Sequence, residues 1–271
     1  MSEAIKLFIV EGEDRDLRFI KEMTQIFFRG KFSAKIIQLP AAQNIYMLYQ
    51  KLEEDCFETD VVEVVRDTVK EAEFVLNGIQ RQEIDEVYLF FDYDLHNNNL
   101  KKDKNADEIL ISMLQFFNNE TDNGKLYISY PMVEALYDYR DGMCQPFSNC
   151  FVKCNDICRY KDLSGNNNPK ACMHRDIREW KMILAIFALR INCLFGESCS
   201  FEYYRNSVFP DTILREQQKI VKENQKVFVL SALPEFLLDY FKIDFWNTMV
   251  NLTKFRFIDC PLNKQEEQFG K

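Results

Sequence analysis

Residues 7–12 read LFIVEG and residues 87–94 read VYLFFDYD, and these two stretches decide the fold class. Each begins as a continuous apolar run, which is typical of a parallel strand that is covered on both faces. Each run ends in carboxylates, with Glu11 after the first run and Asp92 and Asp94 after the second. In α/β proteins, ligands bind at the carboxyl ends of parallel strands. The sequence therefore predicts an acidic site at that edge of a sheet.

The rest of the first half alternates between strand and helix patterns. Further strands are expected at 34–39 and 126–128, and helices at 14–29, 43–82 and 107–118. The long helical stretch should break near residues 59–60, where Asp60 is expected to cap the next helix. The apolar face of that helix should carry Val62, Val65, Val69, Phe74 and Leu76. Strands that alternate with helices predict an α/β fold with a parallel, doubly wound sheet.

The second half has a different pattern and is expected to be mainly helical. Residues 140–175 are rich in cysteine, asparagine and charge, and apolar helical patterns follow at 177–194, 211–224 and 233–252. We place the domain boundary at residue 140. Residues 1–140 then form a metal-binding α/β domain, and residues 141–271 form a helical domain or extension.

Three segments of the chain resemble the Toprim domain of topoisomerases, primases and several nuclease families. Val10-Glu11-Gly12 is similar to its strand that ends in Glu-Gly, and Asp92-Tyr93-Asp94 is similar to its Asp-x-Asp segment. Residues 129–134, SYPMVE, resemble the S-x-P-x-x-E segment of RloB-like and OLD-type Toprim proteins of bacterial anti-phage, abortive-infection systems. The similarity covers residues 5–140, and it implies a Toprim-like parallel sheet flanked by helices.

The resemblance implies Mg²⁺- or Mn²⁺-dependent cleavage of nucleic-acid phosphodiester bonds by a toxic defence effector. In that family pattern Asp92 and Asp94 are metal ligands, Glu11 is a metal ligand or a general acid or base, and Glu134 adds a further catalytic carboxylate. The residue types suit this chemistry because Mg²⁺ prefers oxygen ligands. Side chains at i and i+2 of an extended segment also point the same way, so both aspartates can face one ion. The alternative is that these carboxylates only cap the helices that follow.

The overall charge limits how the chain can meet nucleic acid. The chain has 34 basic and 43 acidic residues, a net charge of −9, which opposes binding by bulk electrostatics. Basic side chains could still line a groove for the backbone of DNA or RNA, and the candidates are Lys101, Lys102, Lys104, Arg159, Lys161, Lys170, Arg175, Arg178 and Lys181. No apolar run approaches the ~20 residues of a membrane span, and no signal peptide is expected, so a cytoplasmic location is predicted.

A zinc site is a further option in the second half. Cys154, Cys158, Cys172 and His174 could supply four ligands, although their spacing is not that of a standard zinc knuckle. The alternative is that the nine cysteines of the chain are reduced, and most of them small core residues.

Partners are expected for two reasons. The chain has no P-loop, so any ATPase that accompanies it would be a separate protein. A nuclease that cannot regulate itself needs restraint by a partner or by self-assembly as a homo-oligomer, and the apolar stretch 233–246 is the candidate surface.

Two alternative functions remain open: a Toprim-like scaffold that does not cleave, and a receiver-like phosphoacceptor module.

Overall fold

The computed structural model describes residues 3–12, 14–40, 44–93, 106–138, 150–166, 168–196 and 200–251. The chain divides into two compact units, Met1–Ile128 and Ser129–Lys271. The division therefore falls before the SYPMVE segment, whereas the sequence placed the boundary after it.

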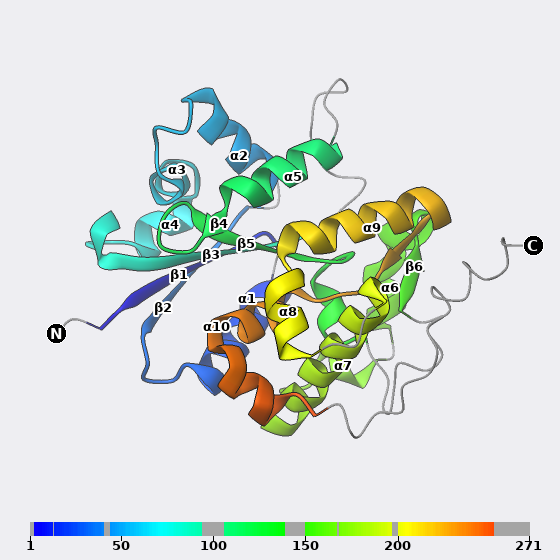
Figure 1. Ribbon diagram of the computed structural model, residues 1–271. Helices are drawn as coiled ribbons and strands as arrows, with labels where there is room; N and C mark the ends of the chain where they lie inside the picture. Colours follow the sequence, from blue (N-terminus) through cyan, green and yellow to red (C-terminus); the bar gives the residue numbers. More distant parts are fainter. Residues whose placement is uncertain are drawn as a thin grey trace, which may run out of the picture. The chain divides into compact units, whose positions relative to one another are not determined.

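The first unit is built on a five-stranded sheet with the strand order β2-β1-β3-β5-β4 (Figure 1). Its strands are β1 (Ile5–Val10), β2 (Ser33–Gln38), β3 (Ile84–Asp92), β4 (Asn118–Asn119) and β5 (Gly124–Ser129). Strand β1 pairs in parallel with β2 on one side and with β3 on the other, and the short β4 is antiparallel to β5. The predicted α/β class is confirmed.

Helices cover both faces of this sheet. They are α1 (Asp14–Phe27), α2 (Ile45–Glu54), α3 (Val61–Thr68), α4 (Lys70–Val75) and α5 (Ala106–Phe116). Figure 1 shows α1 on one side of the sheet and α2 to α5 on the other. The chain moves from β1 to β2 in one direction along the sheet and then back past β1 to β3 in the other direction. Because both crossovers are right-handed, this reversal places their helices on opposite faces of the sheet.

The two apolar runs form the centre of the sheet. Leu7, Phe8, Ile9 and Val10 are fully buried, and residues 87–91 are each at most 4% exposed. The rings of Phe8 and Tyr88 lie 5.6 Å apart across the β1–β3 pair. Close packing of this kind makes the strand ends a firm platform for the loops that follow them.

The Asp60 cap is confirmed, but one apolar position is wrong. Asp60 is the N-cap of α3, and its Oδ1 accepts a hydrogen bond of 2.7 Å from the Val62 backbone N–H. Phe74 was expected on the buried face, yet it is 80% exposed. The helix ends at Thr68 and a new one begins at Lys70, so the helical phase that predicted Phe74 does not continue.

The second unit is mainly helical, as predicted. Its α-helices are α6 (Tyr160–Gly165), α7 (Ile177–Phe195), α8 (Phe201–Ser207), α9 (Pro210–Asn224) and α10 (Ala232–Met249). Short 3₁₀ helices are η2 (Val133–Leu136), η4 (Cys154–Arg159) and η5 (Pro169–Ala171). An antiparallel pair, β6 (Phe151–Lys153) with β7 (Lys226–Phe228), was not expected from the sequence.

Gln217 of α9 joins that helix to the small sheet. Its side chain is fully buried, its Nε2 donates to the Phe228 carbonyl at 2.7 Å, and its Oε1 accepts from the Phe228 N–H at 3.0 Å. The amide therefore pairs with the edge of β7 in the way that a neighbouring strand would.

The partner surface expected over residues 233–246 is only partly exposed on helix α10. Residues 233–238 are buried, so they belong to the core of the protein and are not available for docking. The backbone kinks at Lys242, which has φ 58° and ψ −145°. Ile243, just beyond the kink, is 43% exposed.

Candidate functional site

The carboxyl ends of β1 and β3 form a topological switch point in the sheet. From β1 the chain passes to β2 on one side, and it later returns to β3 on the other side. Loops leave such a point in opposite directions, which opens a crevice where α/β proteins bind ligands. Glu11 directly follows β1, and Asp92 is the last residue of β3.

The structure brings Glu11 and Asp92 together. The Glu11 N–H donates to the Phe90 carbonyl at 3.3 Å, which extends the strand pairing by one residue. The Asp92 N–H donates to Glu11 Oε2, also at 3.3 Å. Both residues are half-buried. The Glu11 carboxylate is therefore held over the end of β3 by the backbone of that strand.

Asp16 is a third carboxylate at this edge, and sequence reasoning missed it. It lies in the first turn of α1 and is only 6% exposed. A Cβ built on Gly12 would lie 1.9 Å from Asp16 Oδ2, so the carboxylate packs directly over the Gly12 Cα. The sequence did show an acidic run after Gly12, but helix capping was a sufficient explanation for it.

Glu134 belongs to the second unit, where it is 2% exposed within η2. The segment before it turns through a cis peptide bond between Tyr130 and Pro131. Ser129 Oγ accepts a hydrogen bond of 3.3 Å from the Ala232 N–H at the start of α10. Glu134 is thus a buried carboxylate and not a surface one.

Asp94 and the basic loop residues Lys101, Lys102 and Lys104 lie outside the described residues. Among the residues that the structure does describe, no three His, Cys, Asp or Glu side chains are close enough together to hold a metal ion. Glu11, Asp92 and Asp16 therefore do not form a complete cage. A metal at this edge would need Asp94, water or substrate oxygens as well.

The four expected zinc ligands do not gather into a site. All four residues are described by the structure, and among the described residues no group of three or more possible metal ligands is found. Cys154 is buried, whereas Cys158 and Cys172 are exposed. Burial raises the pKa of the Cys154 thiol, which disfavours the thiolate that zinc requires.

One of the expected phosphate-contacting residues is not on the surface. Arg175 is 3% exposed, and its Nη2 donates to the Lys170 carbonyl at 3.1 Å. It therefore belongs to the core of the second unit and cannot line a groove for a nucleic-acid backbone.

Comparisons with protein-family models, with curated proteins and with solved structures find no match to this chain. Within the described residues, no helix is long and apolar enough to cross a membrane. A function must therefore be inferred from the residues at the switch point and from the three sequence segments that resemble Toprim proteins.

Proposed function

We propose that the chain is a Mg²⁺- or Mn²⁺-dependent nuclease with its active site at the carboxyl ends of β1 and β3. The observation that carries the proposal is the hydrogen bond of 3.3 Å from the Asp92 N–H to Glu11 Oε2, at the switch point of the sheet. It brings the Glu-Gly segment and the start of the Asp-x-Asp segment to one place, although 80 residues separate them along the chain.

The donor set suits a hard divalent cation. Glu11, Asp92 and Asp94 offer carboxylate oxygens, and Mg²⁺ is usually held by one or two carboxylates together with water and substrate phosphate. When bound, such an ion neutralises phosphate charge and orients the attacking water. Glu11 would hold the ion and exchange a proton with that water, since its position is set by the backbone of β3.

The charge of the chain supports a need for metal. At −9 the protein repels a phosphate backbone, and carboxylates at the site add to that repulsion locally. A divalent ion held by Asp92 would reverse the sign of the local field for an approaching phosphate. DNA and RNA both fit this description. By the resemblance, the biological role is that of a toxic effector in bacterial anti-phage defence, acting in the cytoplasm and controlled by a partner such as a separate ATPase.

Cleavage assays on the purified full chain test the proposal. Single- and double-stranded DNA and RNA would be incubated with Mg²⁺, with Mn²⁺ or with EDTA. Glu11→Gln and Asp92→Asn keep the side-chain shape but remove charge, and each should lower kcat by about 10²- to 10⁴-fold, because a metal ligand contributes several kcal/mol. Asp85→Asn is the matched control. Asp85 lies on the same strand at its amino end, where it accepts from the Ile5 N–H at 2.8 Å.

An Asp92→Asn protein that cleaves as fast as wild type would refute the mechanism. Wild-type protein that is inert on every substrate would favour the second candidate, a receiver-like phosphoacceptor. The order β2-β1-β3-β5 is also that of receiver-type sheets, in which an acidic residue ends the third strand. Acetyl phosphate should then add a phosphoryl group to wild type but not to Asp92→Asn, as read by intact mass.

A further inference from the structure

Arg190 is a buried cation in the middle of the apolar helix α7. It is 6% exposed, and Ile186, Phe187, Leu189 and Ile191 around it in the helix are buried as well. Taking a guanidinium out of water is costly, and an apolar side chain at such a position is often at least as stable. The place of Arg190 in the core therefore calls for a reason other than packing.

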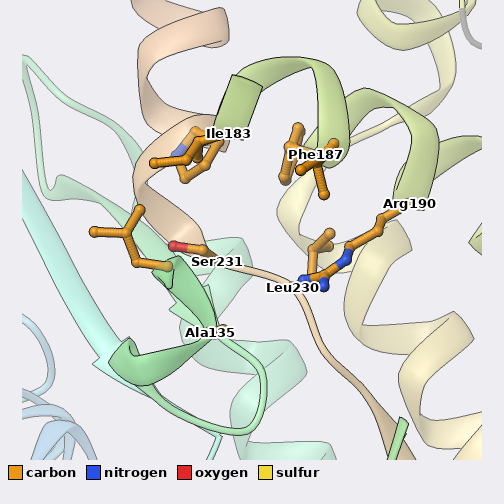
Figure 2. Close-up of a pocket in the computed structure, with 9 residues that line it drawn as sticks. Ala135, Ile183, Phe187, Arg190, Leu230 and Ser231 are labelled. Carbon is orange, nitrogen blue, oxygen red and sulfur yellow. The ribbon is translucent and has the colours of Figure 1, made fainter. Parts of the chain in front are cut away.

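The Arg190 guanidinium bridges two segments that lie far apart in the sequence. Its Nη2 donates to the Asp138 carbonyl at 2.6 Å, and its Nη1 donates to the Val229 carbonyl at 3.1 Å. Asp138 lies two residues beyond the end of η2, and Val229 lies in the stretch that leads into α10. Figure 2 shows the guanidinium beside Leu230, at the edge of a pocket that Ala135 of η2 also lines.

Other contacts hold the same segment at both of its ends. At one end, Tyr130 and Leu230 exchange backbone hydrogen bonds of 2.7 and 2.9 Å. At the other end, the Tyr160 hydroxyl donates to Asp138 Oδ2 at 2.6 Å. Residues 130–138 are therefore anchored on both sides of Glu134.

Glu134 is tied to this anchor through its own backbone. Its carbonyl accepts from the Tyr137 N–H at 3.1 Å and from the Asp138 N–H at 3.2 Å. Burial, and then the Asp138 carboxylate, raise the pKa of Tyr160 well above its usual range, and Glu134 and Arg190 also act on that phenol. All four side chains thus share one poorly hydrated cluster, in which Arg190 is the only cation of the four.

We propose that Arg190 is a positioning residue for Glu134, and that it fixes residues 130–138 by joining the Asp138 and Val229 carbonyls. The inference rests on the proposed nuclease function and on the Toprim resemblance, which implies that Glu134 adds a catalytic carboxylate. Arg190 itself contacts no reacting atom in this scheme. Its effect on cleavage must therefore pass through Glu134.

A double-mutant cycle on cleavage tests that route. Arg190→Met should lower kcat by about 10- to 100-fold with little change in KM, because a misplacement of about 1 Å in a catalytic group has an effect of this size. In a Glu134→Gln background the same change should have almost no further effect. Arg190→Lys keeps the positive charge and should retain more cleavage activity than Arg190→Met. It also serves as the test variant if Arg190→Met does not fold. Arg175→Met is the matched control, because Arg175 is similarly buried and bonds the carbonyl of Lys170, which lies outside residues 130–138.

Hydrogen exchange gives a readout that does not need activity. The amides of Tyr137 and Asp138 should exchange faster in Arg190→Met, on the order of tenfold for the loss of one anchoring contact. Equal loss of kcat in the wild-type and Glu134→Gln backgrounds would overturn the inference, and so would unchanged exchange at these two amides. If the wild-type protein cleaves nothing, the proposed function fails, and the exchange rates alone then decide whether Arg190 holds the segment.

Discussion

Gly12→Ala should force the Asp16 carboxylate out of its place at the candidate site. A Cβ at residue 12 would lie 1.9 Å from Asp16 Oδ2 and 2.6 Å from its Cγ. Real Cβ atoms essentially never come closer than 3.0 Å, so the two atoms have to separate by at least 1.1 Å, and by 1.5 Å to reach ordinary contact at 3.4 Å. Asp16 is 6% exposed, so the protein around it has little room for that movement.

The size of the effect follows from two opposing terms. Overpacking of a buried site costs about 2 kcal/mol. Replacing glycine restricts the unfolded chain, which stabilises the protein by about 0.7 kcal/mol. Gly12→Ala should therefore lower the free energy of unfolding by about 1 kcal/mol. In an Asp16→Ala background the clash is absent, so the same substitution should be neutral or slightly stabilising.

Urea unfolding of the four proteins measures this coupling. Circular dichroism follows both units, whereas Trp180 and Trp246 both lie in the second unit, so their fluorescence serves as an internal control. The coupling between the two substitutions should be about 2 kcal/mol and should appear in the transition of the first unit. An equal effect of Gly12→Ala in both backgrounds would refute the close packing of Asp16 on Gly12. The cleavage assay adds a second result, since a shift of more than about 1 Å at the site should lower kcat by about 100-fold.

Two further predictions concern the second unit. Gln217→Ala leaves the buried N–H and carbonyl of Phe228 without their side-chain partners, which should lower the free energy of unfolding in urea by about 2–4 kcal/mol. Gln218→Ala, at the half-buried neighbouring residue, is the control and should cost much less. Equal losses in the two variants would contradict the strand-like role of Gln217. Burial and the Asp138 carboxylate raise the pKa of Tyr160, so its contribution to stability should be fully present below the unfolded pKa of about 10 and should be lost as the pH rises beyond it. Tyr160→Phe should flatten the fall in the free energy of unfolding between about pH 10 and 11, and a fall as steep as that of wild type would show that Tyr160 does not cause it.

Local sequence determined the strands, the helix starts and the acidic edge of the first unit. The apolar runs at 7–10 and 87–91 are buried because continuous apolar residues of strand length have no other stable place. Asp60 caps α3 because its side chain can reach an N–H two residues ahead. Glu11 and Asp92 follow from the same logic, since parallel strands carry their carboxyl ends to a common edge. Each of these features depends on residues that are close in sequence or on a general rule of sheet topology.

Tertiary structure alone decided which side chains support those elements. The buried Arg190 joins Asp138 to Val229, Gln217 pairs with Phe228, and Asp16 fills the space that Gly12 leaves open. Phe74 shows the reverse case, because a helix break five residues earlier turns an apolar side chain outward. None of these contacts follows from a helical or strand repeat in the sequence. They form because folding withdraws polar groups from water, and each buried donor or acceptor then takes whatever partner the packed chain brings within reach.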